Sequence, residues 1–311
     1  MKVLEEKINT AISLKNILFA TDFSDVSEAA LPYVTAMSLR YGGMVHVAHV
    51  LPEINLVPPT AIDPITIGSI YENAHSGAQE QMQQLSLRIK GFPHHTYVRR
   101  GKVSEVLSQI IREQEIDLLV VGTHGRTGVG KLLLGSVAEE IFRQATCPVF
   151  TVGPRVPRFT RLSENRGQRE VAPTELELRQ ILYATDFTPH SLGAASYAFS
   201  LAREFRTRLT LLHVMEEYGE HLHDRPGPID AALRKLEKLT WEEPALRYSP
   251  EPIVEFGSPA DSILETATER DADLIVLGVR PDHIDAAIHL PWATAHKVVA
   301  RANCPVLTVR G

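Results

Sequence analysis

The sequence predicts an α/β protein with two tandem doubly wound domains, each a five-stranded parallel sheet with helices on both faces. The chain has 311 residues, 44% of them apolar, which is enough for two hydrophobic cores. Three sequence blocks occur in the same order in both halves. Short apolar runs alternate with segments long enough for right-handed crossover helices, a pattern typical of parallel sheets.

The repeat sets the domain boundaries. ILFATDFSDVSEAALPYV returns as ILYATDFTPHSLGAASYA, GKVSEVLSQIIREQEIDLLVVG as GSPADSILETATERDADLIVLG, and RQATCPVFTV as ARANCPVLTV. We expect an N-terminal domain at 1–154, a linker at 155–175 and a C-terminal domain at 176–311. The segment from Arg155 to Arg169 holds five arginines against one acid, Glu164. A solvated linker is favoured over an anion or RNA contact, because the segment lacks interleaved aromatic residues for stacking.

The strands of the first half follow from short apolar runs. ILFA and DLLVVG, like DLIVLG in the second half, show no apolar–polar alternation, as expected of strands buried on two sides. The expected strands are Asn16–Thr21, Met44–Val50, His95–Arg99, Asp117–Val121 and Val149–Val152.

Helix start signals come directly after the first strand of each half. Thr188 is an N-cap followed by Pro189 at the first helical position, and Ser24 stands at the equivalent place in the first half. Asp22 and Asp186 are therefore left at the carboxyl end of their strands, where ligands bind in such sheets.

Composition limits the classes of function. The net charge of −6 gives no overall attraction to nucleic acid or anionic membranes, so we expect neither as a partner. No apolar run reaches the roughly 18 residues of a membrane helix, and the N-terminus does not read as a signal peptide, which predicts a cytoplasmic location. Cys147 and Cys304 read as small buried residues. The 13 histidines lack metal-site spacing, so no metal ligand is assigned among them.

The stretch G-R-T-G-V-G-K resembles the phosphate loop of ATPases but lacks the Ser or Thr that follows the lysine in that motif. The residue after the lysine is Leu132, which cannot offer the hydroxyl that binds magnesium. A phosphate loop of this type also follows the first strand of its domain, whereas this stretch follows the fourth. A direct ATPase loop is therefore disfavoured.

A second grouping of the same glycines fits better. Gly122 and Gly125 form a G-x-x-G pair, and after nine further residues Gly135 is followed by Ser136. Such glycines allow the backbone close to a polyphosphate, and a helix N-terminus at Ser136 offers amide donors. Arg126 adds positive charge, as does Lys131.

This G-x-x-G, nine-residue, G-S spacing, with TDFS after the first strand and a closing CPVxTV strand, resembles the universal stress protein family in its tandem form. The resemblance covers nearly the whole chain and implies an adenine-nucleotide-binding fold with strand order 3-2-1-4-5. It further implies that the last strands, which commonly pair subunits, pair within this chain, and it leaves a homodimer open. The nucleotide-binding residues that it implies are Asp22, Val50, Gly122, His124, Gly125, Arg126, Gly135, Ser136 and Val137.

The second half departs from this pattern. Gly278 is kept, but Trp292 and Ala293 align with the G-S pair, and Asp282 and Asp285 replace the basic residues of the loop. A bulky side chain and two carboxylates should exclude a polyphosphate. We therefore expect one nucleotide per chain, held by the N-terminal domain.

The leading functional hypothesis is a stress-response regulator or sensor that binds ATP, or ADP or AMP, with Mg²⁺ as an optional companion of the phosphates. A slow ATP hydrolase or autokinase is one alternative, although no residue is singled out as catalytic. A nucleotide-free scaffold is the other.

Overall fold

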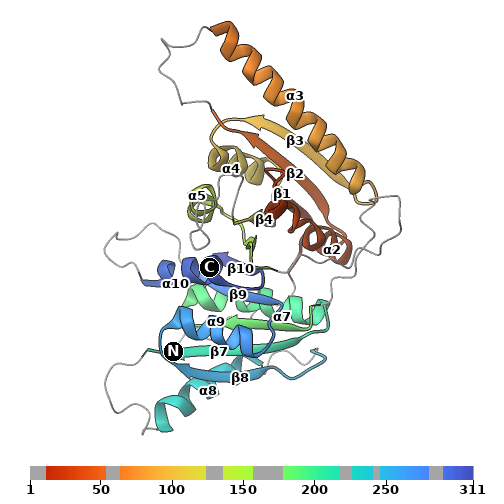
Figure 1. Cartoon of the computed structure of the whole chain (residues 1–311). Coiled ribbons are helices and arrows are strands. Elements are labelled where there is room, and N and C mark those ends of the chain that lie inside the picture. Colours follow the sequence, from red (N-terminus) through yellow and green to blue (C-terminus); the bar gives the residue numbers. More distant parts are fainter. Residues whose placement is uncertain are drawn as a thin grey trace.

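The computed structural model describes residues 12–53, 64–123, 136–156, 178–216, 226–240, 246–279 and 290–310. It confirms the predicted α/β class with two similar halves (Figure 1). The expected linker lies almost wholly outside the described residues, so its role stays a prediction.

The first half alternates strands and helices as the apolar runs predict, and each strand lies within one residue of its expected ends. Its elements are β1 (Asn16–Ala20), α1 (Asp25–Glu28), α2 (Leu31–Tyr41), β2 (Met44–Leu51), α3 (Pro64–Arg88), β3 (His94–Arg100), α4 (Val103–Glu113), β4 (Leu118–Gly122), α5 (Ser136–Gln144) and β5 (Val149–Val152).

The second half repeats this order. Its elements are β6 (Gln180–Ala184), α6 (Pro189–Gly193), α7 (Ala195–Glu204), β7 (Arg208–Met215), α8 (Pro226–Thr240), β8 (Glu251–Phe256), α9 (Pro259–Glu269), β9 (Leu274–Val279), α10 (Leu290–Arg301) and β10 (Val306–Arg310).

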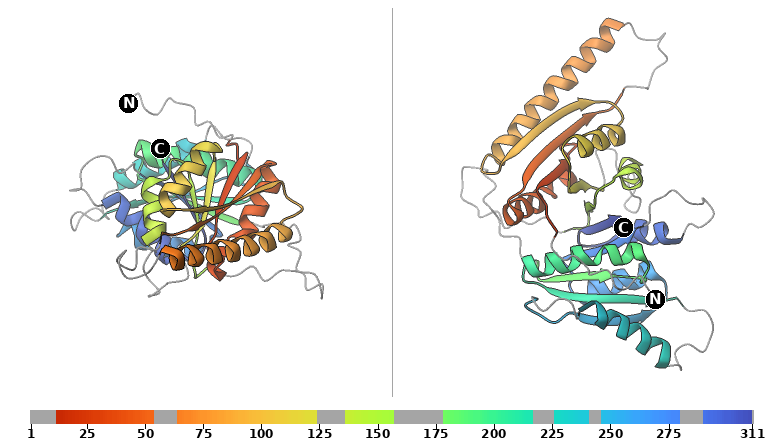
Figure 2. Two further views of the ribbon diagram at one scale, coloured as in Figure 1. Left: turned by 90° about the horizontal axis from the view of Figure 1, so that it is seen from above. Right: turned by 180° about the vertical axis from the view of Figure 1, so that it is seen from behind.

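The strands form a single sheet in the order β3-β2-β1-β4-β5-β10-β9-β6-β7-β8. The first half therefore has the implied strand order 3-2-1-4-5. The second half has the same order when it is read from the opposite edge of the sheet. Within each half the strands are parallel, whereas β5 and β10 pair antiparallel, with Phe150 opposite Leu307. The view from behind shows the two halves one above the other with β10 between them (Figure 2).

Two apolar clusters cover the two faces of the sheet, as buried non-alternating strands require. One cluster includes Ile17 and Phe19 of β1 with buried residues of α2, α3, α7 and α8. The other includes Leu18 with residues of α4, α5, α9 and α10. Each cluster draws on both halves of the chain, so the core is continuous across the β5–β10 junction.

A helix begins directly after the first strand of each half, as the helix start signals predict. Ser24 and Thr188 do act as N-caps, each accepting a hydrogen bond from the main-chain amide three residues on. The helices that they cap are only one turn long, however, and α2 and α7 begin separately after Ala30 and Ala194. These short helices α1 and α6 fix the chain directly after the first strand of each half.

Candidate functional site

The turn that follows β1 holds Asp22 through local hydrogen bonds. The Asp22 carboxylate accepts a hydrogen bond from the Ser24 amide (3.0 Å), and the Thr21 hydroxyl accepts one from the Phe23 amide (2.9 Å). Thr21 Oγ1 also lies 3.0 Å from the hydroxyl oxygen of Ser27 on α1. Asp22 is thereby fixed at the carboxyl edge of the central strand, as the sequence predicts.

The turn after β6 has the same construction. Asp186 Oδ1 accepts hydrogen bonds from the Thr188 amide (2.9 Å) and hydroxyl (2.6 Å), and the Phe187 amide donates to Thr185 Oγ1 (3.0 Å). Burial opposes ionisation of Asp186, but hydrogen bonds from Ser191 and Thr188 outweigh it and hold the pKa of this carboxyl below its ordinary value. Asp186 therefore has a structural role in its own turn.

An aromatic ring in each turn packs on a histidine of the neighbouring strand. Phe23 and Phe187 both have a φ of 60°, in the left-handed region that bulky residues rarely adopt. Their ring centroids lie 4.5 Å and 4.4 Å from those of His49 and His213. The Nδ1 atom of each histidine donates to a threonine carbonyl, Thr21 or Thr185, at 2.8 Å. The histidines thus fasten the second strand to the turn.

The short helices α1 and α6 pack closely against Gly122 and Gly278, where a side chain would not fit. A Cβ on Gly122 would lie 3.1 Å from the backbone of Ser27 in α1, and one on Gly278 would lie 2.3 Å from the His190 carbonyl oxygen and the Ser191 Cα atom in α6. Close strand–helix packing therefore explains why Gly278 is kept although the loop after it has diverged. The sequence had suggested only a ligand-facing role for Gly122.

The remaining predicted residues are placed in part. Val50 is buried near the carboxyl end of β2, which pairs with β1. Ser136 and Val137 form the first residues of α5, as the helix start at Ser136 predicts. The rest of the predicted set lies outside the described residues, so its contact with phosphates stays a prediction: His124, Gly125, Arg126 and Gly135.

Lys102 is a charged residue of this edge that the motif did not include. It is the residue before α4, and its ammonium group contacts the Glu140 carboxylate on α5. A hydrogen bond from Lys102 lowers the pKa of Glu140, and the same bond raises the pKa of Lys102. The repeat carried a signal, because Gly101-Lys102 returns as Gly257-Ser258 and the charge is lost in the second half.

The cysteines are buried, as predicted. Burial raises the pKa of both Cys147 and Cys304 to about 12, so neither thiol is activated for chemistry. Within the part of the chain that the structure describes, no cluster of side chains could hold a metal ion. The described helices include none that is both long and apolar enough to cross a membrane.

Comparison with known proteins gives one consistent family. A family model described as the universal stress protein family matches residues 13–153 and 177–310. A universal stress protein of Mycolicibacterium smegmatis is 25% identical over 306 residues, which is 94% of this chain and 96% of the relative. A single-domain universal stress protein of Thermus aquaticus is 36% identical over 137 residues, covering 42% of this chain and 98% of its own length.

A solved structure supports the fold across both halves. The crystal structure of a universal stress protein from Archaeoglobus fulgidus has a TM-score of 0.65 with 20% sequence identity, and the match covers 96% of this chain and 99% of the other. At this identity the likeness concerns the fold alone.

Proposed function

The chain belongs to the universal stress protein family in tandem form, and from that premise we propose that it is a stress-response regulator or sensor that binds one adenine nucleotide in its N-terminal half. The observation that carries the proposal is the convergence of Asp22, Val50 and the N-terminus of α5 at one edge of the sheet. β1 lies between β2 and β4, so the carboxyl ends of these three strands are adjacent. Ligands of doubly wound sheets bind at this edge.

The chemistry of this edge suits an adenine nucleotide. Asp22 provides a carboxylate that can accept hydrogen bonds from ribose hydroxyls, and the backbone at Val50, near the end of β2, can hold the base. The first amides of α5 offer donors to phosphate oxygens, whereas the charge of Lys102 is balanced by Glu140 on the same helix. ATP is the proposed ligand, with ADP, AMP and accompanying Mg²⁺ as variants of the same proposal.

We favour a regulatory role over catalysis because neither Asp22 nor Glu140 is placed to act as the base of phosphoryl transfer. Phosphoryl transfer needs a carboxylate or base that orients the attacking group near the terminal phosphate. Asp22 stands at the nucleoside end, and Glu140 is engaged by Lys102. We therefore propose that the nucleotide sets a conformation or partner surface and turns over slowly if at all. The cytoplasm remains the proposed location.

We further propose that the two halves act as one unit through the β5–β10 pairing, with the boundaries 1–154, 155–175 and 176–311 predicted above. The antiparallel register and the continuous apolar clusters support this arrangement. Association of two chains into a homodimer would then use another surface.

The repeat supplies a matched test of the N-terminal site. Asp22→Ala and Asp186→Ala each remove the hydrogen bond from the amide two residues on, and Asp186→Ala also removes the one from the Thr188 hydroxyl, so both should lower the melting temperature. Only Asp22→Ala should weaken ATP binding, by at least tenfold in calorimetry. Equal ATP affinity in both variants would contradict the proposed site.

The stoichiometry separates the remaining functions. Denaturation of freshly purified protein, followed by mass spectrometry of the released molecules, should give about one adenine nucleotide per chain. No nucleotide, with no thermal shift on adding ATP and Mg²⁺, would favour the scaffold alternative. Multiple turnovers of ATP that are lost in Gly135→Trp would favour the hydrolase.

A further inference from the structure

An open groove of about 1180 Å³ lies where the end of α2 in the first half meets the second half. Its other walls come from the starts of β6 and β7, the end of α7 and the turns before β8 and β9. α2 and α7 approach each other here, across the junction of the two halves (Figure 1). The volume exceeds the roughly 300–1,000 Å³ of small-molecule pockets. None of the lining residues belongs to the proposed nucleotide site, so the groove is a separate surface.

Two arginines of this groove occupy positions that are uncharged in the first half. The strand registers place Arg208, at the start of β7, where the first half has Met44. Two residues earlier, Arg206 stands in the place of Gly42, and the two residues have φ values of 52° and 62°. Glycine adopts this left-handed conformation without strain, whereas arginine does not. Arg206 therefore places a guanidinium group in the groove at a position that favours glycine.

Tyr248 is exposed in the same groove and contacts two arginines. The strand registers align it with Phe92 of the first half. Phe92 is buried, whereas Tyr248 is 39% exposed. The guanidinium carbon atoms of Arg208 and Arg247 lie 5.7 Å and 5.4 Å from the centroid of the Tyr248 ring. An arginine stacked on an aromatic ring keeps its planar fork of N–H donors for a carboxylate.

The charged residues of the groove leave an excess of positive charge. The lining includes the arginines Arg40, Arg179, Arg206, Arg208 and Arg270 and the acidic residues Glu204, Asp271 and Asp273. Glu204 pairs with Arg40 at 3.5 Å, and Asp273 accepts hydrogen bonds from two main-chain amides at 2.7 Å and 3.0 Å. Among the residues that the structure describes, neither Arg206 nor Arg208 has an acidic partner. These two arginines are available to an anionic ligand.

The groove also exposes apolar surface from both halves. Leu39 of α2 is 59% exposed and lines the groove together with Tyr248 and the partly buried Phe205. Exposed apolar side chains that are rimmed by charged residues mark interaction surfaces. Because Leu39 belongs to the first half and Tyr248 to the second, an occupant of the groove would contact both.

We propose that this groove binds a partner protein through an acidic segment that carries an apolar residue. Carboxylates of the segment pair with Arg206, Arg208 and Arg247, and its apolar residue covers Leu39. A nucleic acid fits less well. Single-stranded nucleic acids bind through stacking on aromatic faces, and two guanidinium groups already lie over the Tyr248 ring.

Peptides selected from a random-sequence display library on the full chain provide the probes. The recovered peptides are labelled with fluorescein and titrated by fluorescence anisotropy. Arg206→Gly and Arg208→Met restore the residues of the first half, so the double variant removes two charges from the groove and should keep the melting temperature. Arg112→Met, at an exposed position on α4 of the first half, removes an arginine away from the groove and controls for net charge.

We expect the recovered peptides to be rich in aspartate and glutamate and to contain an apolar residue. Their dissociation constants should rise at least about fivefold in the double variant, because each exposed charge pair contributes modestly. They should stay unchanged in Arg112→Met. Leu39→Gln should weaken binding several-fold, whereas Tyr248→Phe, which keeps the ring, should not. Replacing the acidic residues of the peptide by their amides should abolish binding, and added salt should weaken it.

Three results would overturn the inference. One is a set of recovered peptides without an excess of acidic residues. Another is acidic peptides that bind the folded double variant as tightly as the wild type, because these would bind elsewhere. The third is a single-stranded oligouridylate that binds the wild type but not the double variant while acidic peptides fail to bind, which would assign the groove to RNA.

Discussion

Phe23 and Phe187 have strained backbone conformations that contacts with neighbouring residues stabilise. A non-glycine residue in the left-handed region costs about 1–3 kcal/mol, and each phenylalanine has a φ of 60°. Main-chain hydrogen bonds to the preceding threonine and the ring contact with a histidine hold this conformation. The occurrence of the same turn in both halves, with and without the glycine-rich loop, shows that the turn is a structural unit independent of that loop.

The charge of Asp186 should contribute stability that depends on pH. Its folded-state pKa is lowered from an ordinary value of 3.8, so the stabilisation is present above that value and is lost as pH falls through the lower folded pKa. Asp186→Asn keeps the side-chain oxygen and removes the charge. The difference in unfolding free energy between wild type and this variant should be constant near neutral pH and should shrink below 3.8. Urea unfolding across this range measures it, and a difference that grows in acid would contradict the assignment.

Gly278 and Gly122 should respond differently to the same substitution. Gly278→Ala places a Cβ 2.3 Å from backbone atoms of α6, whereas Gly122→Ala places one 3.1 Å from α1. Overpacking of this kind costs about 1–3 kcal/mol, and Gly278→Ala should reach or exceed the upper value because backbone must move. Gly122→Ala should cost about 1 kcal/mol. Denaturant midpoints compare the two, with Gly77→Ala in α3 as a control that has open space at its Cβ. Equal losses at Gly122 and Gly278 would argue against strand–helix contact as their role.

At the scale of elements, the strands were predictable and the helix boundaries were less so. Buried runs such as DLLVVG carry no alternation and end at turn residues, so their positions follow from sequence. The break between α1 and α2 has no such signal, because Ala29 and Ala30 are good helix formers. The start of α3 at Pro64 was not predicted either.

The candidate site was predictable to a similar degree. The position of Asp22 follows from the end of the first strand, and Ser136 stands at the expected helix start as the first residue of α5. The packing role of Gly122 depends on a tertiary contact with α1, which no local pattern reports. Lys102 joins the site only because α4 and α5 lie side by side, and its signal was the change to serine in the repeat.

The β5–β10 pair should depend on two threonines. Thr151 Oγ1 donates to the Val306 carbonyl (2.9 Å) and Thr308 Oγ1 donates to the Val149 carbonyl (3.2 Å), so the two bonds cross the junction in opposite directions. Thr151→Val and Thr308→Val keep shape and should each cost about 0.5–1.5 kcal/mol. Thr96→Val on β3, an exposed strand position, is the matched control and should change stability little. Thermal unfolding of the three variants measures the effect, and no difference from the control would show that the hydroxyls contribute nothing to the junction.

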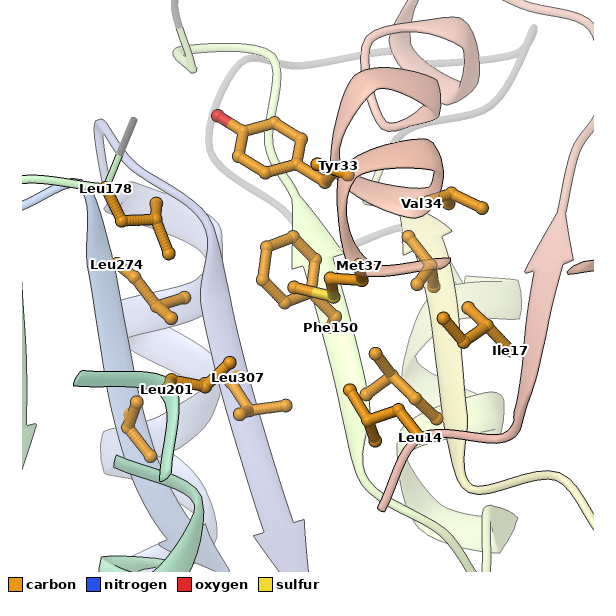
Figure 3. Packing of buried hydrophobic residues seen from close by; sticks show 14 of the residues in the cluster. Leu14, Ile17, Tyr33, Val34, Met37, Phe150, Leu178, Leu201, Leu274 and Leu307 are labelled. Carbon is orange, nitrogen blue, oxygen red and sulfur yellow. The ribbon is translucent and has the colours of Figure 1, made fainter. Parts of the chain in front are cut away.

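For the whole molecule, the junction joins the two halves into one sheet whose apolar clusters run across both halves. Phe150 lies next to Tyr33 and Met37 of α2, within its own half (Figure 3). In the other direction it pairs with Leu307 of the second half. The Tyr33 and Phe150 ring centroids are 5.3 Å apart, and both side chains are buried. Each half therefore relies on the other to cover the edge of its last strand.

A separated first half should consequently associate with itself. A fragment of residues 1–156 would expose the unpaired edge of β5, whose four residues are all buried in the full chain. Exposed apolar strand edges pair with other chains. The existing pairing is antiparallel and centred near Phe150, so a second copy of β5 can replace β10 by a two-fold arrangement. Light scattering coupled to size-exclusion chromatography should show two fragments per particle. The full chain is the control, because β10 already covers this edge. A folded fragment that stays monomeric at high concentration would show that β5 does not need a partner strand.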